Sequence, residues 1–321
     1  MRAKTPKTLY ICLLTLFCVL AFSDSTYARS INDGLGTKSF TWLKSISDAG
    51  ISAAGECFAA RDDYAGLLVQ PAAVAGRADG TVKMSYVSHY IDTQYGSLGY
   101  TRKINDKDIG LRLLYVNYGE FVRTSSTRER LGTFTAGEMG LTLNIGKQVR
   151  DDLKVGAMVS YMSSKIEDFT AQAAAVDLGV LYTPPFDGVT VGATLMNLGK
   201  VTKSYSSGYE DRLPMFLTVG ARKKLSHAPI TFFTDIIFPN DNDIVYAFGI
   251  EVSIRDRLFL YTGTKSRSDI DINTYKAKTD FSGISTFGFG VTIDRYRFNY
   301  AYLPDDALED IHKITLSLKV P

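Results

Sequence analysis

From about residue 80 to the end of the chain, apolar and polar residues alternate with a period of two. This period places the apolar side chains on one face of a β-strand and the polar or small ones on the other. Several runs extend over nine residues or more, which exceeds a usual globular strand and matches the length of a membrane-spanning strand. One run has Met139, Leu141, Leu143 and Ile145 on the apolar face and Glu138, Gly140, Thr142 and Asn144 on the other.

The runs predict an all-β fold of about 14 strands, an even number. Even numbers are typical of antiparallel barrels in bacterial outer membranes. The expected strands lie near residues 81–90, 95–104, 108–118, 133–149, 153–163, 173–182, 189–198, 215–224, 230–238, 244–254, 258–265, 285–293, 296–302 and 312–320.

The connections between these strands alternate in length. Short links follow the even-numbered strands, as at 105–107, 150–152 and 294–295, and long polar links follow the third, seventh and eleventh, at 119–132, 199–214 and 266–284. Short turns on one side and long loops on the other are typical of an antiparallel transmembrane β-barrel. The alternative is a secreted soluble propeller or sandwich. A propeller predicts a repeat of about forty residues, and we find none.

Small residues recur on the polar face of the strands. If the apolar face meets lipid, these residues point into the lumen, where they indicate either sharp bends of the sheet or room for something inside. The glycines concerned are Gly140, Gly146, Gly156, Gly179, Gly192, Gly220, Gly249, Gly288 and Gly290.

Residues 1–28 have the order of a secretory signal peptide. Basic residues at Arg2, Lys4 and Lys7 precede an apolar stretch from Leu9 to Phe22, and the small residue Ala28 marks the expected cleavage site. The stretch is shorter than the roughly 20 residues that a membrane helix needs. We therefore expect a removed signal and export to the bacterial outer membrane, the alternative being a retained membrane helix.

Cleavage after Ala28 would leave equal numbers of basic and acidic residues. A chain without a basic excess is not expected to bind nucleic acid. The three histidines, His89, His227 and His312, lie far apart in the sequence without cysteine partners, so neither a metal site nor a cofactor is expected. No catalytic motif is present, and we expect no enzyme.

The segment 29–80, ahead of the first strand, has a different composition. Residues 39–49 predict a short helix with one apolar side, and residues 53–74 are rich in alanine and glycine. We expect this segment to form a small helical plug inside a barrel made by residues 81–321. The alternative is an N-terminal extension in the periplasm.

Residues 53–72 resemble the N-terminal block of the PorV/PorQ family, which runs Gly-Met-Gly-Gly-Ala-Phe-x-Ala, an Asp-Asp pair and Asn-Pro-Ala. The matching residues here are Gly55, Phe58, Asp62, Asp63 and Pro71. Adjacent aspartates point apart in regular structure, so a turn or cap role is expected for this pair. The segments 196–199, 298–304 and 311–318 also resemble family strands. Two departures stand out, Gln70 in place of the asparagine and Glu56 in place of the second glycine.

The resemblance implies an outer-membrane barrel of the FadL-like type, with 14 strands and an N-terminal plug. It implies passage of hydrophobic small molecules, long-chain fatty-acid-like, across the outer membrane. Its expected partners are outer-membrane lipid and a hydrophobic ligand. The alternative function is a non-enzymatic scaffold or shuttle that binds exported proteins or secretion-system components.

Overall fold

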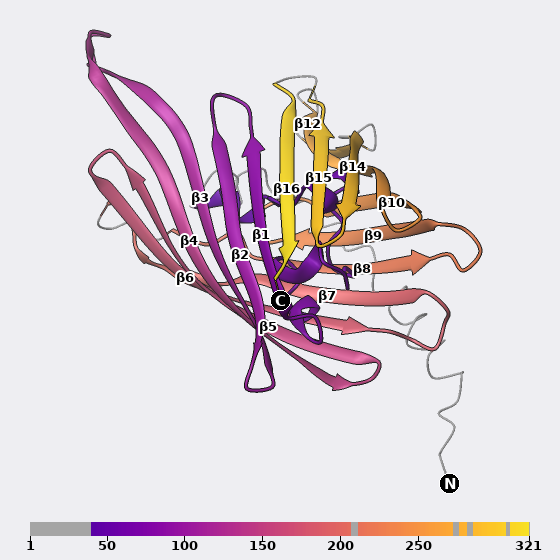
Figure 1. Cartoon of the computed structure of the whole chain (residues 1–321). Coiled ribbons are helices and arrows are strands. Elements are labelled where there is room, and N and C mark those ends of the chain that lie inside the picture. Colours follow the sequence, from indigo (N-terminus) through magenta and orange to yellow (C-terminus); the bar gives the residue numbers. More distant parts are fainter. Residues whose placement is uncertain (1–39, 207–210, 272–275, 281–284, 306–308, 321) are drawn as a thin grey trace. The chain divides into compact units, whose positions relative to one another are not determined.

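Fourteen strands of the described residues close into one antiparallel barrel (Figure 1). The computed structural model describes residues 40–206, 211–271, 276–280, 285–305 and 309–320. The signal peptide predicted for 1–28, with its cleavage site Ala28, therefore lies outside the described residues. The strands are β1 (Asp79–Ser88), β2 (Gln94–Ile104), β3 (Lys107–Thr124), β4 (Arg130–Arg150), β5 (Leu153–Ile166), β6 (Phe169–Tyr182), β7 (Val189–Lys203), β8 (Phe216–Lys224), β9 (Ile230–Pro239), β10 (Val245–Ile254), β11 (Leu258–Lys265), β12 (Arg267–Asp271), β13 (Lys276–Asp280), β14 (Ser285–Ile293), β15 (Tyr296–Leu303) and β16 (Ile311–Lys319).

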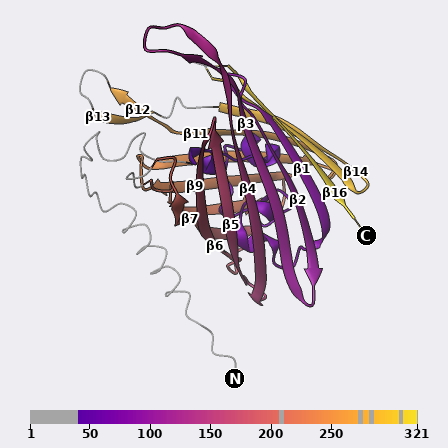
Figure 2. The same cartoon turned by 90° about the vertical axis from the view of Figure 1, so that its left-hand side faces the viewer.

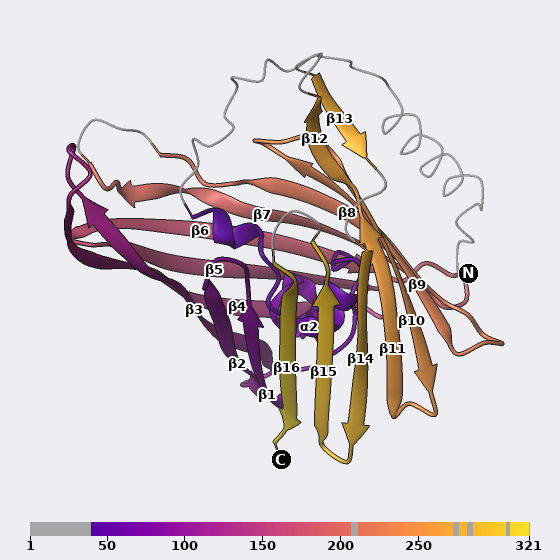
Figure 3. The same ribbon diagram turned by 90° about the horizontal axis from the view of Figure 1, so that it is seen from above.

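Each strand of the barrel pairs with its neighbour in sequence, and β1 pairs with β16 to close the ring (Figure 3). The connection from β11 to β14 contains the hairpin β12–β13, which forms a separate two-stranded sheet. The predicted all-β antiparallel barrel of about 14 strands is thus confirmed. Closure leaves no strand edge unpaired along the ring, which removes the usual liability of a sheet edge.

The alternating pattern sets the inside and the outside of the barrel. On β4, Leu141 and Leu143 are exposed on the outer face, while Thr142 and Asn144 are buried on the inner face. The same arrangement holds for the strands around the ring, so the apolar face points outward, as the sequence predicts.

The two ends of the barrel differ in their connections. At one end, called the turn end, links of two residues such as 105–106, 151–152 and 294–295 join the strands. At the other, called the loop end, longer links such as 204–215 and 304–310 do so. The predicted long loop at 119–132 is wrong: β3 and β4 continue through it as a paired hairpin that projects beyond its neighbours (Figure 2). Stacking of Phe121 on Phe134 across that hairpin favours the strand.

Residues 40–78, called the inner segment, precede the first strand. They contain the 3-10 turns η1 (Thr41–Lys44), η2 (Gly66–Leu68) and η3 (Pro71–Val74) and a single α-helix, α2 (Ala49–Ala53). The helix predicted for 39–49 is wrong over its described part. Asp48 accepts a hydrogen bond from the N–H of Ile51 and is the N-cap of α2. The helix therefore begins at Ala49, the residue at which the predicted helix ends. None of the helices described has the length and apolarity needed to cross a membrane.

Candidate functional site

The inner segment packs directly against glycines of the barrel wall, with backbone atoms at some positions and side chains at others. At each of these positions a Cβ atom would collide with the segment, so the absence of a side chain permits the contact. Of the nine polar-face glycines, seven meet the inner segment. The inner segment therefore contacts the polar face of the barrel wall at these glycines. The contacts are Gly140 with Trp42, Gly146 with Val74 and Ala75, Gly156 with Pro71 and Ala72, Gly179 with Gln70 and Pro71, Gly192 with Ala59, Gly249 with Ala54, and Gly288 with Ala53.

Inward-facing side chains of the wall satisfy the backbone of the inner segment. Asp235 on β9 accepts hydrogen bonds from the N–H groups of Phe58 and Ala59, at 2.7 and 3.0 Å. Thr286 on β14 accepts from the N–H of Gly55 at 3.1 Å. Buried N–H groups need such partners, and here they come from strands on the wall. The segment consequently combines the backbone hydrogen bonds of its short helical turns with hydrogen bonds to side chains of the wall.

Ion pairs add to this attachment. Lys83 on β1 lies 2.7 Å from Asp48. Arg61 is fully buried, 3.1 Å from Asp63 and 3.4 Å from Glu251, with its guanidinium 3.7 Å above the ring of Phe233. A buried cation needs such compensation, because an unpaired charge is costly in a low-dielectric interior.

Glu56 binds two lysines from two different strands of the wall. Lys265 at the end of β11 lies 2.8 Å from Oε2, and Lys313 on β16 lies 3.2 Å from Oε1. Burial by itself would raise the pKa of Glu56, but Lys265 and then Lys313 outweigh it and lower that pKa to about 2. Lys313 also donates to the carbonyl of Ile46 and to Ser52 Oγ. Two ammonium groups share one carboxylate, so one positive charge remains uncompensated within this trio.

Each motif residue that the family resemblance singles out has a structural role in the inner segment. Gly55 has φ of 68° beside the carbonyl of Phe248, a conformation and a space that exclude a side chain. Asp62 pairs with Lys154 and Arg77, at 2.7 and 3.0 Å.

Phe58 packs in a buried cluster with Ile51 and Met196. The other two motif residues lie at short turns. Asp63 Oδ1 accepts from the N–H groups of Ala65 and Gly66, which stabilises a turn ahead of η2. Pro71 begins η3. Gln70 accepts from the N–H of Ala72 at 2.9 Å and donates to the carbonyl of Ala59 at 2.7 Å, so its longer side chain joins two turns of the segment.

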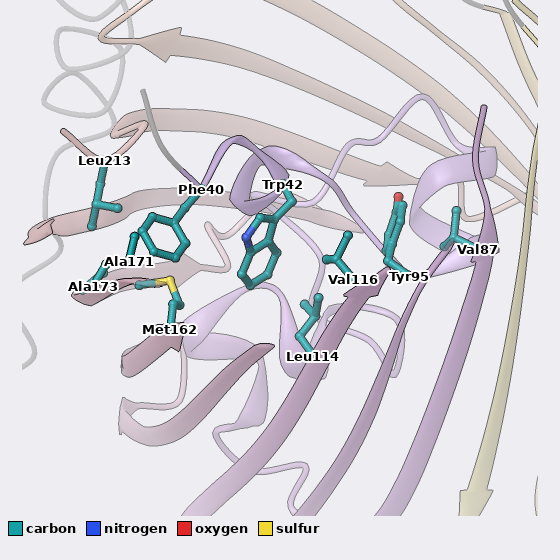
Figure 4. Close-up of a cluster of buried hydrophobic side chains, with 11 residues drawn as sticks. Phe40, Trp42, Val87, Tyr95, Leu114, Val116, Met162, Ala171, Ala173 and Leu213 are labelled. Atoms are coloured by element: carbon teal, nitrogen blue, oxygen red, sulfur yellow. The ribbon is translucent and has the colours of Figure 1, made fainter. Parts of the chain in front are cut away.

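A cavity of about 550 Å³ lies between the inner segment and the wall. Its apolar lining includes Trp42, Phe58, Leu114, Met162 and Met196, and its polar lining includes the Glu56 trio. Figure 4 shows Trp42 beside Met162 and Leu114 in the buried cluster at this lining. Tyr90, Asn242 and Ile311 also line it and belong to loop-end connections or strand ends. The cavity therefore lies toward the loop end of the barrel.

Sequence reasoning missed the charged wall residues of this site. Lys265, Lys313 and Asp235 occupy inward positions of strands that it assigned correctly. Charged residues on the polar face of a predicted strand were the available signal, because a lumen position needs a partner for each charge. No group of three or more metal-ligating side chains suited to a metal ion is found in the part of the chain that the structure describes.

The chain shares its fold with transporters and channels of known structure. It superposes on the Pseudomonas putida toluene transporter TodX with a TM-score of 0.60 at 13% sequence identity, covering 86% of this chain and 99% of that one. For the monoaromatic hydrocarbon channel CymD the TM-score is 0.58 at 12% identity, with coverage of 87% and 98%. A Pseudomonas aeruginosa FadL homologue gives 0.51 at 10% identity, with coverage of 85% and 98%.

No family model matches the sequence, and no curated protein matches it either. At these identities the likeness concerns the fold. In its fold the chain is a closed 14-strand barrel similar to those of TodX, CymD and the FadL homologue.

Proposed function

We propose that this chain is a bacterial outer-membrane barrel that passes hydrophobic, long-chain fatty-acid-like molecules, with the inner segment as its plug. The observation that carries the proposal is the cavity, which combines an apolar lining with the two lysines and the one carboxylate of the Glu56 trio. Ligand sites of this kind are concave and mostly apolar, with a few polar groups that fix orientation. The FadL-type fold and the exposed apolar outer face support the membrane location.

Lys265 is the residue proposed to bind the ligand's carboxylate. Lys313 is buried and makes bonds to three acceptors, whereas the Lys265 side chain is about a quarter exposed, at 27%. Its ammonium donates to Glu56 and lines the cavity. A fatty-acid carboxylate at Lys265 would leave the alkyl chain against the apolar lining formed by Trp42 and Met162.

Uptake of oleate by liposomes that carry the protein tests the proposal. We expect uptake above that of empty liposomes, and about a tenfold loss in Lys265→Met, because a hydrogen bond between charged groups contributes about 1.5 kcal/mol. Uptake of an uncharged aromatic hydrocarbon should be unchanged in that variant. Lys165→Met, at an exposed loop-end lysine, is the matched control.

Oleate uptake no greater than in empty liposomes would overturn transport. The scaffold or shuttle role is then the alternative, and its signature is a stable exported or secretion-system protein that co-purifies with the barrel. Membership of the PorV/PorQ family stays a prediction of the N-terminal block.

A further inference from the structure

Three basic side chains lie together on the outer face of β2, β3 and β4 near the turn end. Arg102 shares the outward alternation of Leu98 and Ile104, and Lys107 shares that of Leu111. Lys147 lies between Ile145 and Val149, which are both about half exposed. All three basic residues are exposed. Outward positions of this barrel are otherwise apolar here, so the cations interrupt the apolar surface at its turn-end edge.

The strand register brings the three cations within reach of one small anion. Ile104 pairs with Lys107, and the pair Asp108–Gly146 places Lys107 opposite Lys147 on the next strand. Directly opposed side chains are about 5 Å apart at Cβ. Arg102 pairs with Ile109, which makes it a diagonal neighbour of Lys107 at about 7 to 8 Å. This spacing suits a phosphate group that accepts hydrogen bonds from several donors.

Nearby carboxylates are turned away or engaged elsewhere. Asp108 points inward and accepts from the N–H of Gly76 at 2.7 Å. Asp106 lies 3.5 Å from Lys103, and Asp152 lies 3.1 Å from Arg150. Among the described residues, no carboxylate forms an ion pair with any member of the cluster. Asp79, the cross-strand partner of Arg102, is likewise engaged, because it lies 2.6 Å from Lys319 and accepts from Tyr64 and Thr81. The three cations of this patch therefore have no ion-pair partner among the described residues.

We propose that Arg102, Lys107 and Lys147 bind the phosphate headgroup of an anionic glycerophospholipid on the outer face of the barrel. The exposed side chains of Ile104, Ile145 and Val149 would pack against its acyl chains. An amphiphile fits because the cations and the apolar side chains lie side by side, and a free phosphate would use only the cations. The inference rests on the proposed membrane location and is independent of what the lumen carries.

Lipid binding to the full chain in detergent tests this site by native mass spectrometry. The probes are dioleoyl phosphatidylglycerol, dioleoyl phosphatidylcholine and inorganic phosphate. We expect wild type to prefer phosphatidylglycerol, and the Arg102→Gln/Lys107→Gln/Lys147→Gln variant to lose about 100-fold in affinity for it. Each basic residue beside an anionic headgroup contributes about a factor of five. Affinity for phosphatidylcholine should stay the same.

The matched control replaces three exposed lysines near the loop end, Lys165→Gln/Lys200→Gln/Lys203→Gln, and should bind phosphatidylglycerol as wild type does. A faster band on an unboiled gel verifies that each variant is folded. Equal phosphatidylglycerol affinity of wild type and the cluster variant would refute the site, as would an equal loss in the control variant. Displacement of the lipid by equimolar inorganic phosphate would also refute it. Because the readout is binding and not uptake, failed transport and a failed lipid site are told apart.

Discussion

Replacing Glu56 by glutamine tests whether the two lysines hold the inner segment in the lumen. The substitution keeps the size of the side chain and removes its charge. Lys313 would then be left buried with only neutral acceptors, Ile46 O and Ser52 Oγ. The fall in the pKa of Glu56 from 4.5 to about 2 measures how strongly the folded protein favours the carboxylate. That displacement corresponds to about 3 kcal/mol.

The inner segment should therefore open more often in Glu56→Gln while the barrel stays closed. A loss of about 3 kcal/mol raises the population of a locally opened state about 100-fold. Hydrogen–deuterium exchange in detergent measures this directly. Peptides from residues 46–60 should exchange about 100-fold faster than in wild type, and peptides from β4 and β5 should be unchanged. Glu129→Gln, in the exposed β3–β4 connection, is the control. Unchanged protection of residues 46–60 would refute the reasoning that this trio anchors the segment.

Three further outcomes follow from the same contacts, and the fluorescence of the single, buried tryptophan of the chain reports each of them. Gly192→Val should displace the segment and red-shift this emission, because a Cβ there collides with the carbonyl of Ala59, whereas Ala193→Val should leave it unchanged. Asp235→Leu should destabilise the docked segment by about 2 to 4 kcal/mol, since two buried N–H groups lose their acceptor; a denaturant midpoint equal to wild type contradicts this. Acid should release the segment: the folded pKa of Glu56 lies below its unfolded value, so its contribution is complete above about pH 4.5 and is lost as pH falls toward 2. Glu56→Gln should show no transition in that window, and an identical titration in both proteins speaks against the assignment.

The location of the strands follows from the sequence because, in a strand with one apolar and one polar face, apolar and polar residues alternate along the chain. Leu141 and Leu143 alternate with Thr142 and Asn144 whether or not the partner strands are known. The same local pattern of residues predicts which face points outward and where the tight turns lie. The pattern fails at 119–132, where the polar residues predict a loop. The strands extend into this range because residues 120–124 pair across the hairpin, as Phe121 does with Phe134.

The structure of the inner segment does not follow from its local sequence pattern. Its predicted helix over 39–49 is replaced, in the described part, by the short 3-10 turn η1 and non-helical backbone up to Asp48. Side chains of the wall that are distant in sequence bind the backbone of the segment. The N–H of Ala49 donates to Thr315, and that of Gly55 to Thr286. No periodicity within residues 40–78 encodes those acceptors, so the shape of the segment depends on the closed barrel around it.

The sequence alone determined the barrel, its outward apolar face and the small residues that leave its lumen open. Only the tertiary structure decided what fills that lumen and which charges meet there. Glu56 lies more than 200 residues from both of its lysines. They meet because β16 closes on β1 and brings the end of the chain beside its beginning. Pairing between strands that are distant in sequence determines such contacts. A pattern that repeats every two residues does not predict them.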